Sequence, residues 1–251
     1  MREMASLIGK RARLVELGSG SSAKTRILLD HVSDLEAYVP VDISLEYLGP
    51  ASAALAREYP RLAIAPVCAD YSHRFDLPAN GRSASTTVYF PGSTIGNFQP
   101  FEARRFLRMI AGLCGKAGGL LIGVDLKKDH RILDTAYNDD EGVTAASNMN
   151  LLTRINRELE GSFDLSAFRH HAFYDVREGR IEMQLVSTAR QTALAAGVAF
   201  EFSEGEPIST EYSYKYTIEE FQRLSLDAGF VPVRVWTDER RLFSVHYLTV
   251  N

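Results

Sequence analysis

Cysteine and long apolar runs are both scarce in this sequence. The 251 residues contain two cysteines, Cys68 and Cys114, which lie in apolar strand and helix patterns without the spacing of a metal site. We therefore expect two buried free thiols, no bound metal and a reducing, cytoplasmic location. No run approaches about 18 apolar residues, and residues 1–10 lack an apolar signal core, so neither a membrane span nor a signal peptide is expected.

An excess of positive charge is absent as well. Lys and Arg number 28 against 32 Asp and Glu, which gives a net charge of -4. Such a chain has no general attraction for phosphate backbones or anionic lipid, so we expect no nucleic-acid or membrane partner. We expect a monomer that acts on a small molecule. Hydrophobic residues make up 45% of the chain, which is enough for a large core in one domain or in two unequal ones.

A glycine turn joins an apolar strand to a helix near the start of the chain. Residues 13–17 form the predicted strand, Gly18 and Gly20 follow, and a helical pattern begins near Ala23. Because glycine has no Cβ, a ligand can approach the backbone closely at the carboxyl edge of a parallel sheet. With Ala23 in the third place, the turn also matches G-x-G-x-x-A, which suits a dinucleotide. The motif therefore predicts a nucleotide-like ligand and leaves NAD and S-adenosylmethionine open.

Acidic residues at the ends of the next two predicted strands help to distinguish between NAD and S-adenosylmethionine. Asp42 ends the strand 37–42 and can accept hydrogen bonds from both ribose hydroxyls of either cofactor. Asp70 and Tyr71 follow the strand 62–69 and suit an adenine amino group and ring face. Each acid alone is more often a helix cap or turn residue. Acids at successive strand ends favour S-adenosylmethionine.

Strands and helices alternate through the first half of the chain. Apolar runs predict strands at 13–17, 37–42, 62–69, 86–90 and 120–125. Helical periodicity predicts helices at 23–32, 45–58 and 99–114. This alternation predicts an α/β fold with a doubly wound parallel sheet.

The alternation stops after Lys127. A helical, amide-rich stretch is expected at 129–160, followed by strands at 172–176 and 180–186. Polar and apolar residues alternate in the second of these strands, which indicates a sheet with one solvent-exposed face and one buried face. The α/β pattern resumes with a helix at 217–228 and strands at 231–236 and 243–248. We therefore predict a core of residues 1–127 and 216–251, with an inserted α+β region of residues 128–215.

Seven short segments, in order, resemble the histidine Nα-methyltransferases of ergothioneine biosynthesis. The resemblance extends over nearly the whole chain, and residues 92–97, Gly-Ser-Thr-Ile-Gly-Asn, are its most specific part. The segments are 16–20, 90–97, 124–129, 136–139, 142–145, 156–159 and 180–183.

The resemblance implies a Rossmann-like class I methyltransferase that moves three methyl groups from S-adenosylmethionine to the α-amino group of histidine and so makes hercynine. It implies that Gly18 and Lys24 contact the cofactor from its loop, Asp42 binds the ribose, and Asp70 with Tyr71 contacts the adenine. By the same resemblance, the catalytic residues Asn97 and Tyr137 hold the amino-acid end of the substrate. Glu211 and Ser213 bind the imidazole, and Met183 lies near that ring; residues 128–215 thus recognise the substrate.

Each of these residues also has a purely structural interpretation. Asn97 can cap a helix, Glu211 can be a solvated strand residue, and Tyr137 can pack with its hydroxyl at the surface. His170 and His171 invite a metal or general-base hypothesis, but neighbours in a strand face opposite ways, so we expect structural roles for both.

Departures from the resembled family leave two further functions open. Family members carry an amino-terminal helical segment before the glycine turn that contributes to the pocket, and this sequence starts close to its first strand. Pro91 and Ser147 stand where a small aliphatic residue and an aromatic residue are usual. The alternatives are a related methyltransferase for another amino acid or amine, and a shortened relative that binds cofactor without catalysis.

Overall fold

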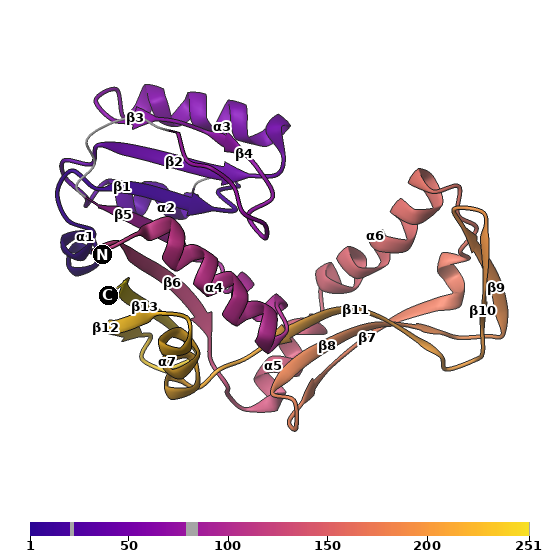
Figure 1. Cartoon of the computed structure of the whole chain (residues 1–251). Coiled ribbons are helices and arrows are strands. Elements are labelled where there is room, and N and C mark those ends of the chain that lie inside the picture. Colours follow the sequence, from indigo (N-terminus) through magenta and orange to yellow (C-terminus); the bar gives the residue numbers. More distant parts are fainter. Residues whose placement is uncertain (21–22, 79–84, 251) are drawn as a thin grey trace. The chain divides into compact units, whose positions relative to one another are not determined.

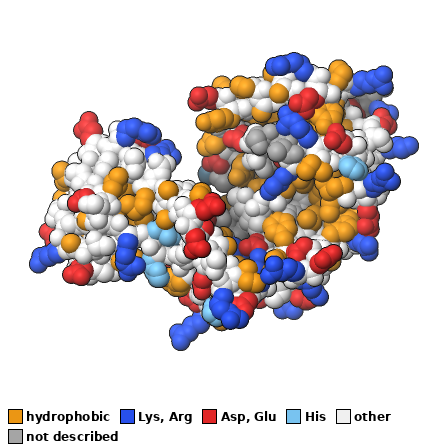
Figure 2. All heavy atoms as spheres, turned by 180° about the vertical axis from the view of Figure 1, so that it is seen from behind, with side chains coloured by type: hydrophobic (Ala, Val, Ile, Leu, Met, Phe, Trp, Pro, Cys, Tyr) orange, Lys and Arg blue, Asp and Glu red, His pale blue; other side chains and the backbone are white. Residues whose placement is uncertain are grey.

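The chain divides into two compact units in the computed structural model, which describes residues 1–20, 23–78 and 85–250. The first unit comprises residues 1–95, 100–126 and 216–251, and the second comprises residues 96–99 and 127–215. None of the helices in the described ranges combines the length and the hydropathy of a membrane-spanning segment. Acidic and basic side chains are interspersed over the face seen in Figure 2.

An eight-stranded, mostly parallel sheet forms the centre of the first unit (Figure 1). Its order is β12-β13-β6-β5-β1-β2-β3, and β4 also pairs with β2. Strands β1 to β6 pair in parallel, whereas β13 is antiparallel to both β6 and β12. The predicted doubly wound sheet is therefore confirmed. Its strands are β1 (Arg13–Leu17), β2 (Ala37–Asp42), β3 (Ala63–Ile64), β4 (Val67–Cys68), β5 (Thr86–Phe90), β6 (Gly119–Asp125), β12 (Phe230–Thr237) and β13 (Phe243–Val250).

Helices cover this sheet because their apolar sides need burial. In α4, for example, Ala103, Phe106, Leu107 and Ile110 are all buried, and the helix packs on β5 and β6. A capping box between Thr217 and Glu220 starts the helix α7. The helices of this unit are α1 (Arg2–Ile8), α2 (Ala23–Leu29), α3 (Leu45–Glu58), α4 (Pro100–Cys114) and α7 (Ile218–Asp227), and the 3-10 helix η1 spans Thr94–Asn97.

Three details of the first unit correct the sequence prediction. The strand expected at 62–69 is two short strands, β3 and β4, separated by Pro66, which has no backbone N–H to give to a ladder. Cys68 is exposed, although it was expected to be buried, and Cys114 is buried as expected. The helix predicted for 23–32 ends at Leu29. Ser21 and Ser22 of the glycine turn lie outside the described residues.

The second unit contains two small antiparallel sheets, two α-helices and one short 3-10 helix (Figure 1). One sheet has the order β11-β8-β7, and the other is the hairpin β9-β10. The alternation predicted for β8 is confirmed, since Ile181, Met183 and Leu185 are buried. The strands are β7 (Phe168–Asp175), β8 (Arg180–Ser187), β9 (Gln191–Ala195), β10 (Val198–Phe202) and β11 (Pro207–Tyr214); the helices are α5 (His130–Tyr137), α6 (Val143–Glu158) and the 3-10 helix η2 (Leu165–Ala167).

The helical stretch predicted for 129–160 is two helices rather than one. Gly142 adopts a left-handed φ of 71° just before α6, which ends helical continuity with α5. The Asp139 carboxylate accepts hydrogen bonds from the backbone N–H groups of Val143 and Thr144, at 2.7 and 2.9 Å. The break therefore has a local cause in residues 138–142.

Candidate active site

A cavity of about 310 Å³ lies at the carboxyl ends of β1 and β5 in the first unit. These strands are adjacent and parallel, and the chain leaves β1 toward β2 on its other side, so the cavity lies at a topological switch point. Open α/β sheets bind their ligands at such points. The described residues that line the cavity are Glu16, Leu17, Gly18, Ser19, Gly20, Lys24, Tyr71, Pro91, Gly92 and Thr94.

Gly18 and Tyr71 form one wall of this cavity. Gly18 has a φ of 68°, and a Cβ placed on it would lie 3.5 Å from the Tyr71 ring and from its hydroxyl oxygen. The Tyr71 ring packs edge-on against Phe90 and Phe106, with centroid distances of 5.7 and 6.5 Å. Contacts with the core thus fix the position of the Tyr71 ring, and the absence of a side chain at Gly18 leaves the backbone beside the ring accessible to a ligand.

Asp42 lies at the end of β2 and fastens the glycine turn to that strand. Its carboxylate accepts hydrogen bonds from the backbone N–H groups of Gly20, at 3.2 Å, and Ser44, at 3.0 Å. The N–H of Gly18 also donates to the Val41 carbonyl at 2.8 Å. A carboxylate has about four acceptor sites, so these bonds leave capacity for ligand hydroxyls.

Asp70 uses its carboxylate to close a local turn. It accepts hydrogen bonds from the Ser72 backbone N–H and hydroxyl, at 2.9 and 2.6 Å, and lies 2.8 Å from the Nδ1 of His73. The Ser72 hydroxyl, more than any other partner, lowers the pKa of Asp70 to about 2. The structural role that acids often have at strand ends is therefore present here, and the adenine contact stays a prediction.

Glu16 is a buried acid beneath the cofactor loop that the sequence analysis did not select. It is 2% exposed and accepts hydrogen bonds from the hydroxyls of Thr25 and Tyr38. Burial raises its pKa to about 7, against the opposing effect of these bonds and of the Lys24 charge. A charged residue inside an otherwise apolar strand is the signal that identifies it.

Polar residues predicted to bind substrate come together in the second unit. The Tyr137 hydroxyl donates to the Ser213 hydroxyl oxygen at 3.0 Å, which joins the end of α5 to β11. Tyr137 is therefore more than a packing residue with its hydroxyl at the surface. Lys215 is 3% exposed, and its Nζ donates to the hydroxyl oxygens of Ser213 and Tyr137, at 2.8 and 3.0 Å.

Glu211 lies two residues before Ser213 on β11, directly opposite Met183 on β8. Met183 is buried and packs with Leu133, Ala172 and Ile181. Glu211 is partly buried, and this burial raises the pKa of its carboxyl while the charge of Lys215 opposes the rise. A partly desolvated carboxylate on this strand differs from the fully solvated residue that strand pattern alone allows.

Asn97 is exposed at the end of η1, in a segment that packs on β11. A Cβ on the preceding Gly96 would lie 2.6 Å from the Tyr214 carbonyl oxygen and 3.5 Å from the Ser213 hydroxyl oxygen. Only glycine allows the loop to approach this closely. The Tyr214 hydroxyl donates to the side chain of Gln99 at 2.7 Å, which holds the other end of the same segment.

Lys215, Arg180 and Gln99 are polar residues of this unit that the sequence analysis missed. Arg180 donates to Glu182 at 2.6 Å and to the Tyr214 hydroxyl, and its guanidinium lies 3.9 Å from the centre of the Tyr212 ring. Lys215 follows Glu211 and Ser213 at the same spacing of two, and this spacing is the signal that would have identified it. No comparable signal marks Gln99.

His170 and His171 have separate, structural surroundings. The His170 ring contacts the Asn148 side-chain amide at 2.9 Å and the Tyr137 carbonyl oxygen at 2.8 Å. The His171 ring instead stacks on Phe173, with a centroid distance of 5.3 Å. Throughout the described ranges, no group of three His, Cys, Asp or Glu residues is arranged to hold a metal.

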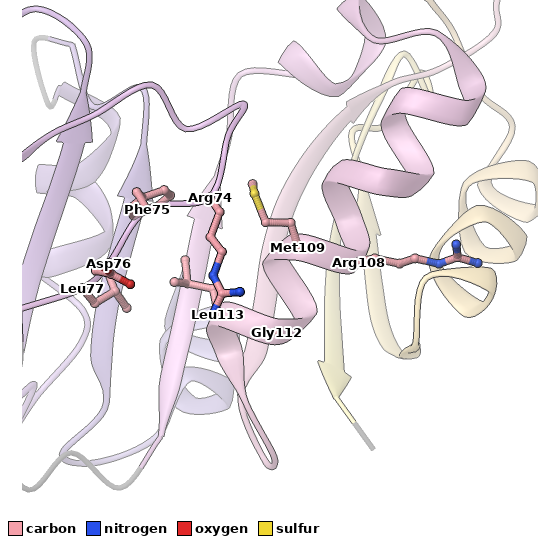
Figure 3. Close-up of a pocket in the computed structure, with 8 residues that line it drawn as sticks. All are labelled: Arg74, Phe75, Asp76, Leu77, Arg108, Met109, Gly112 and Leu113. Atoms are coloured by element: carbon pink, nitrogen blue, oxygen red, sulfur yellow. The ribbon is translucent and has the colours of Figure 1, made fainter.

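A larger cavity of about 440 Å³ lies elsewhere in the first unit, between residues 74–77 and α4 (Figure 3). Met109, Leu113 and Phe75 give it apolar walls. Arg108 points toward α7, where its guanidinium donates to the Asp227 carbonyl at 3.1 Å (Figure 3). None of the predicted site residues lines this cavity, so we do not assign the active site to it.

The fold of the first unit is the Rossmann-like fold of solved S-adenosylmethionine-dependent methyltransferases, as the sequence predicted. The CcbJ methyltransferase from Streptomyces caelestis matches it with a TM-score of 0.56 over 100% of this chain and 94% of that one. The identity is 15%, so this likeness establishes the fold alone.

The particular family follows from the sequence. A family profile described as histidine-specific, S-adenosylmethionine-dependent methyltransferase matches residues 1–250. The histidine N-alpha-methyltransferase of Mycobacterium tuberculosis is 42% identical over 232 residues, which cover 90% of this chain and 71% of that protein. The protein of the same name from Mycolicibacterium smegmatis is 42% identical over 231 residues, with the same coverage. The chain belongs to the histidine-specific, S-adenosylmethionine-dependent methyltransferases.

Proposed function

We propose that this protein transfers three methyl groups in succession from S-adenosylmethionine to the α-amino group of L-histidine. The product is hercynine, and the reaction is the first step of ergothioneine biosynthesis. The observation that carries the proposal is the polar cluster of Tyr137, Ser213 and Lys215 beside Glu211, in a chain that belongs to the histidine-specific family.

Several features of the first unit support the cofactor assignment. The bare backbone at Gly18, the Tyr71 ring and the acceptor capacity of Asp42 fit an adenosine with free ribose hydroxyls. Lys24 lines the same cavity and is assigned to the cofactor loop. S-adenosylmethionine supplies the methyl group from a sulfonium centre. The protein's own task is to position an uncharged amine and to exclude water.

We assign substrate recognition to the second unit. Asn97 and Tyr137 hold the amino-acid end, because the Asn97 amide offers N–H donors and an acceptor oxygen, and the Tyr137 oxygen keeps a lone pair for the substrate amine. Glu211 and Ser213 bind the imidazole, and Met183 provides an apolar contact for the ring. A ring without an N–H leaves a partly buried carboxylate without a partner, so the site favours histidine over apolar amino acids.

Mass spectrometry of reactions between the purified protein, S-adenosylmethionine and a panel of amino acids tests this proposal. We expect mono-, di- and trimethylated histidine to appear in turn, with little product from the other amino acids. Methylation of a different amino acid would instead identify a related N-methyltransferase. Binding of S-adenosylhomocysteine without any methyl transfer would identify a non-catalytic relative.

Calorimetry separates the cofactor assignment from the substrate assignment. We expect S-adenosylhomocysteine to bind and NAD not to bind. The reverse result would overturn the cofactor assignment whatever the substrate. We also propose that the protein acts as a cytoplasmic monomer, which light scattering of the purified protein at several concentrations tests for the oligomeric state.

A further inference from the structure

Three side chains with different hydrogen-bonding properties follow one another along β11. Glu211, Ser213 and Lys215 are spaced by two, and alternate residues of a strand share a face. Lys215 lies one residue beyond the strand end, but its backbone N–H donates to the Gly179 carbonyl at 2.9 Å, so the extended pairing continues to this position. A carboxylate, a hydroxyl and an ammonium group therefore form one row.

The hydrogen bonds of the row determine what Ser213 can offer to a ligand. A serine hydroxyl has one hydrogen and two lone pairs, whereas an ammonium group can only donate. The Ser213 oxygen accepts from Lys215 Nζ at 2.8 Å and from the Tyr137 hydroxyl at 3.0 Å. Both lone pairs are then occupied. The Ser213 hydrogen is the part of the hydroxyl left to bond with a ligand.

Glu211 has the opposite character. An ionised carboxylate only accepts hydrogen bonds, and the Lys215 charge acts against the effect of burial on Glu211. Side by side, Glu211 and Ser213 thus present an acceptor and a donor. A neutral imidazole matches this pair with its N–H and its unprotonated nitrogen. An indole has an N–H but no such nitrogen, and a phenyl ring has neither.

We propose that Lys215 is a positioning residue that makes Ser213 a hydrogen-bond donor, so that the site selects a ring with one N–H and one unprotonated nitrogen. The proposal rests on the proposed function for the identity of the substrate. It goes further by assigning to Lys215 a specificity role that it exercises through Ser213. A lysine that bound the substrate directly would contribute independently of Ser213.

A double-mutant cycle tests the proposal. Histidine binding is measured by calorimetry in the presence of S-adenosylhomocysteine for the parent, Lys215→Met, Ser213→Ala and the double variant. We expect each single change to weaken histidine binding about tenfold, since each removes the oriented donor. The double variant should be no weaker than the weaker single variant. The affinity for S-adenosylhomocysteine alone should stay within about twofold of the parent, which controls for folding.

Two further variants sharpen the test. Lys215→Gln keeps an amide N–H donor and should retain more histidine affinity than Lys215→Met. Lys116→Met removes an exposed lysine of the first unit and should change neither affinity. Unchanged histidine binding by Lys215→Met, or a double variant about a hundredfold weaker than the parent, would overturn the role of Lys215. A parent that binds S-adenosylhomocysteine but not histidine would overturn the proposed function together with this inference.

Discussion

At the scale of single residues, glycine at position 96 is required by a backbone contact. A Cβ there would lie 2.6 Å from the carbonyl oxygen of Tyr214, and a strand carbonyl cannot rotate away as a flexible side chain can. We therefore expect Gly96→Ala to lower the free energy of unfolding by about 1–3 kcal/mol, the usual cost of overpacking. Histidine affinity should fall as well, because Asn97 is displaced. Urea denaturation and calorimetry measure the two effects.

Gly112→Ala is the matched control for this substitution. Gly112 lies within α4, and a Cβ built on it has no atom within 4 Å. Alanine is preferred to glycine inside helices, so this variant should be more stable by about 0.5–1 kcal/mol. Equal losses of stability in both variants would show that the contact with Tyr214 does not determine the effect at Gly96.

Asp42 is the second residue with a sharp expected phenotype. Its carboxylate already accepts from Gly20 N–H at 3.2 Å, and we assign the ribose hydroxyls to its remaining acceptor sites. Asp42→Ala should weaken S-adenosylhomocysteine binding by about 1.5–3 kcal/mol, the size of a hydrogen bond to a charged group. Asp42→Asn keeps one acceptor oxygen and should lose less. Calorimetry in which both variants bind like the parent would remove Asp42 from the site.

At the scale of elements, the sequence predicted periodic segments well and local breaks poorly. The strands 37–42 and 86–90 and the helix 45–58 have the predicted bounds, because each has a clear apolar pattern between turn residues. The helical stretch predicted for 129–160 contains two helices, α5 and α6, and the break between them was not predicted because it depends on the backbone angle at Gly142 and on the Asp139 hydrogen bonds. Periodicity does not contain that information.

For the candidate site as well, the sequence predicted individual residues better than the contacts between them. Motif resemblance selected Tyr137 and Ser213, which the structure joins by a hydrogen bond across 76 residues of sequence. It did not select Lys215, although the spacing of two from Ser213 marks this residue; the second partner, Tyr137, becomes apparent only when α5 and β11 are brought together. Asp70 shows the opposite case. It was selected as an adenine contact, but in the structure its carboxylate closes a turn with Ser72 and His73.

The row of side chains on β11 leads to a prediction about selectivity. Glu211→Ala removes the acceptor for an imidazole N–H, a charge-assisted bond that a phenyl ring cannot form and that should matter less for an indole. We expect kcat/KM for histidine to fall by about tenfold or more, that for tryptophan to fall less, and that for phenylalanine to change little. The ratio of kcat/KM values isolates this discrimination from general damage. Proportional loss for all substrates would assign Glu211 to the fold.

At the scale of the whole molecule, two buried groups make stability depend on pH in opposite directions. Burial raises the pKa of Glu16 to about 7, so the folded state favours its protonated form. Burial lowers the pKa of His246 to about 4, so the folded state favours the neutral ring. Glu16 therefore reduces stability as pH rises from about 4.5 through 7. His246 reduces stability as pH falls from about 6.5 through 4.

Glu16→Gln separates these two contributions. The amide oxygen can still accept from Tyr38 and Thr25, but it cannot ionise. The free energy of unfolding of the variant minus that of the parent should increase by about 2–3 kcal/mol from pH 5 to pH 8, since one pKa unit corresponds to about 1.4 kcal/mol. Urea denaturation of both proteins at the two pH values provides the measurement. Because His246 is unchanged, its contribution cancels in the difference. A difference that does not change with pH would mean that Glu16 ionises as readily in the folded protein as in the unfolded chain.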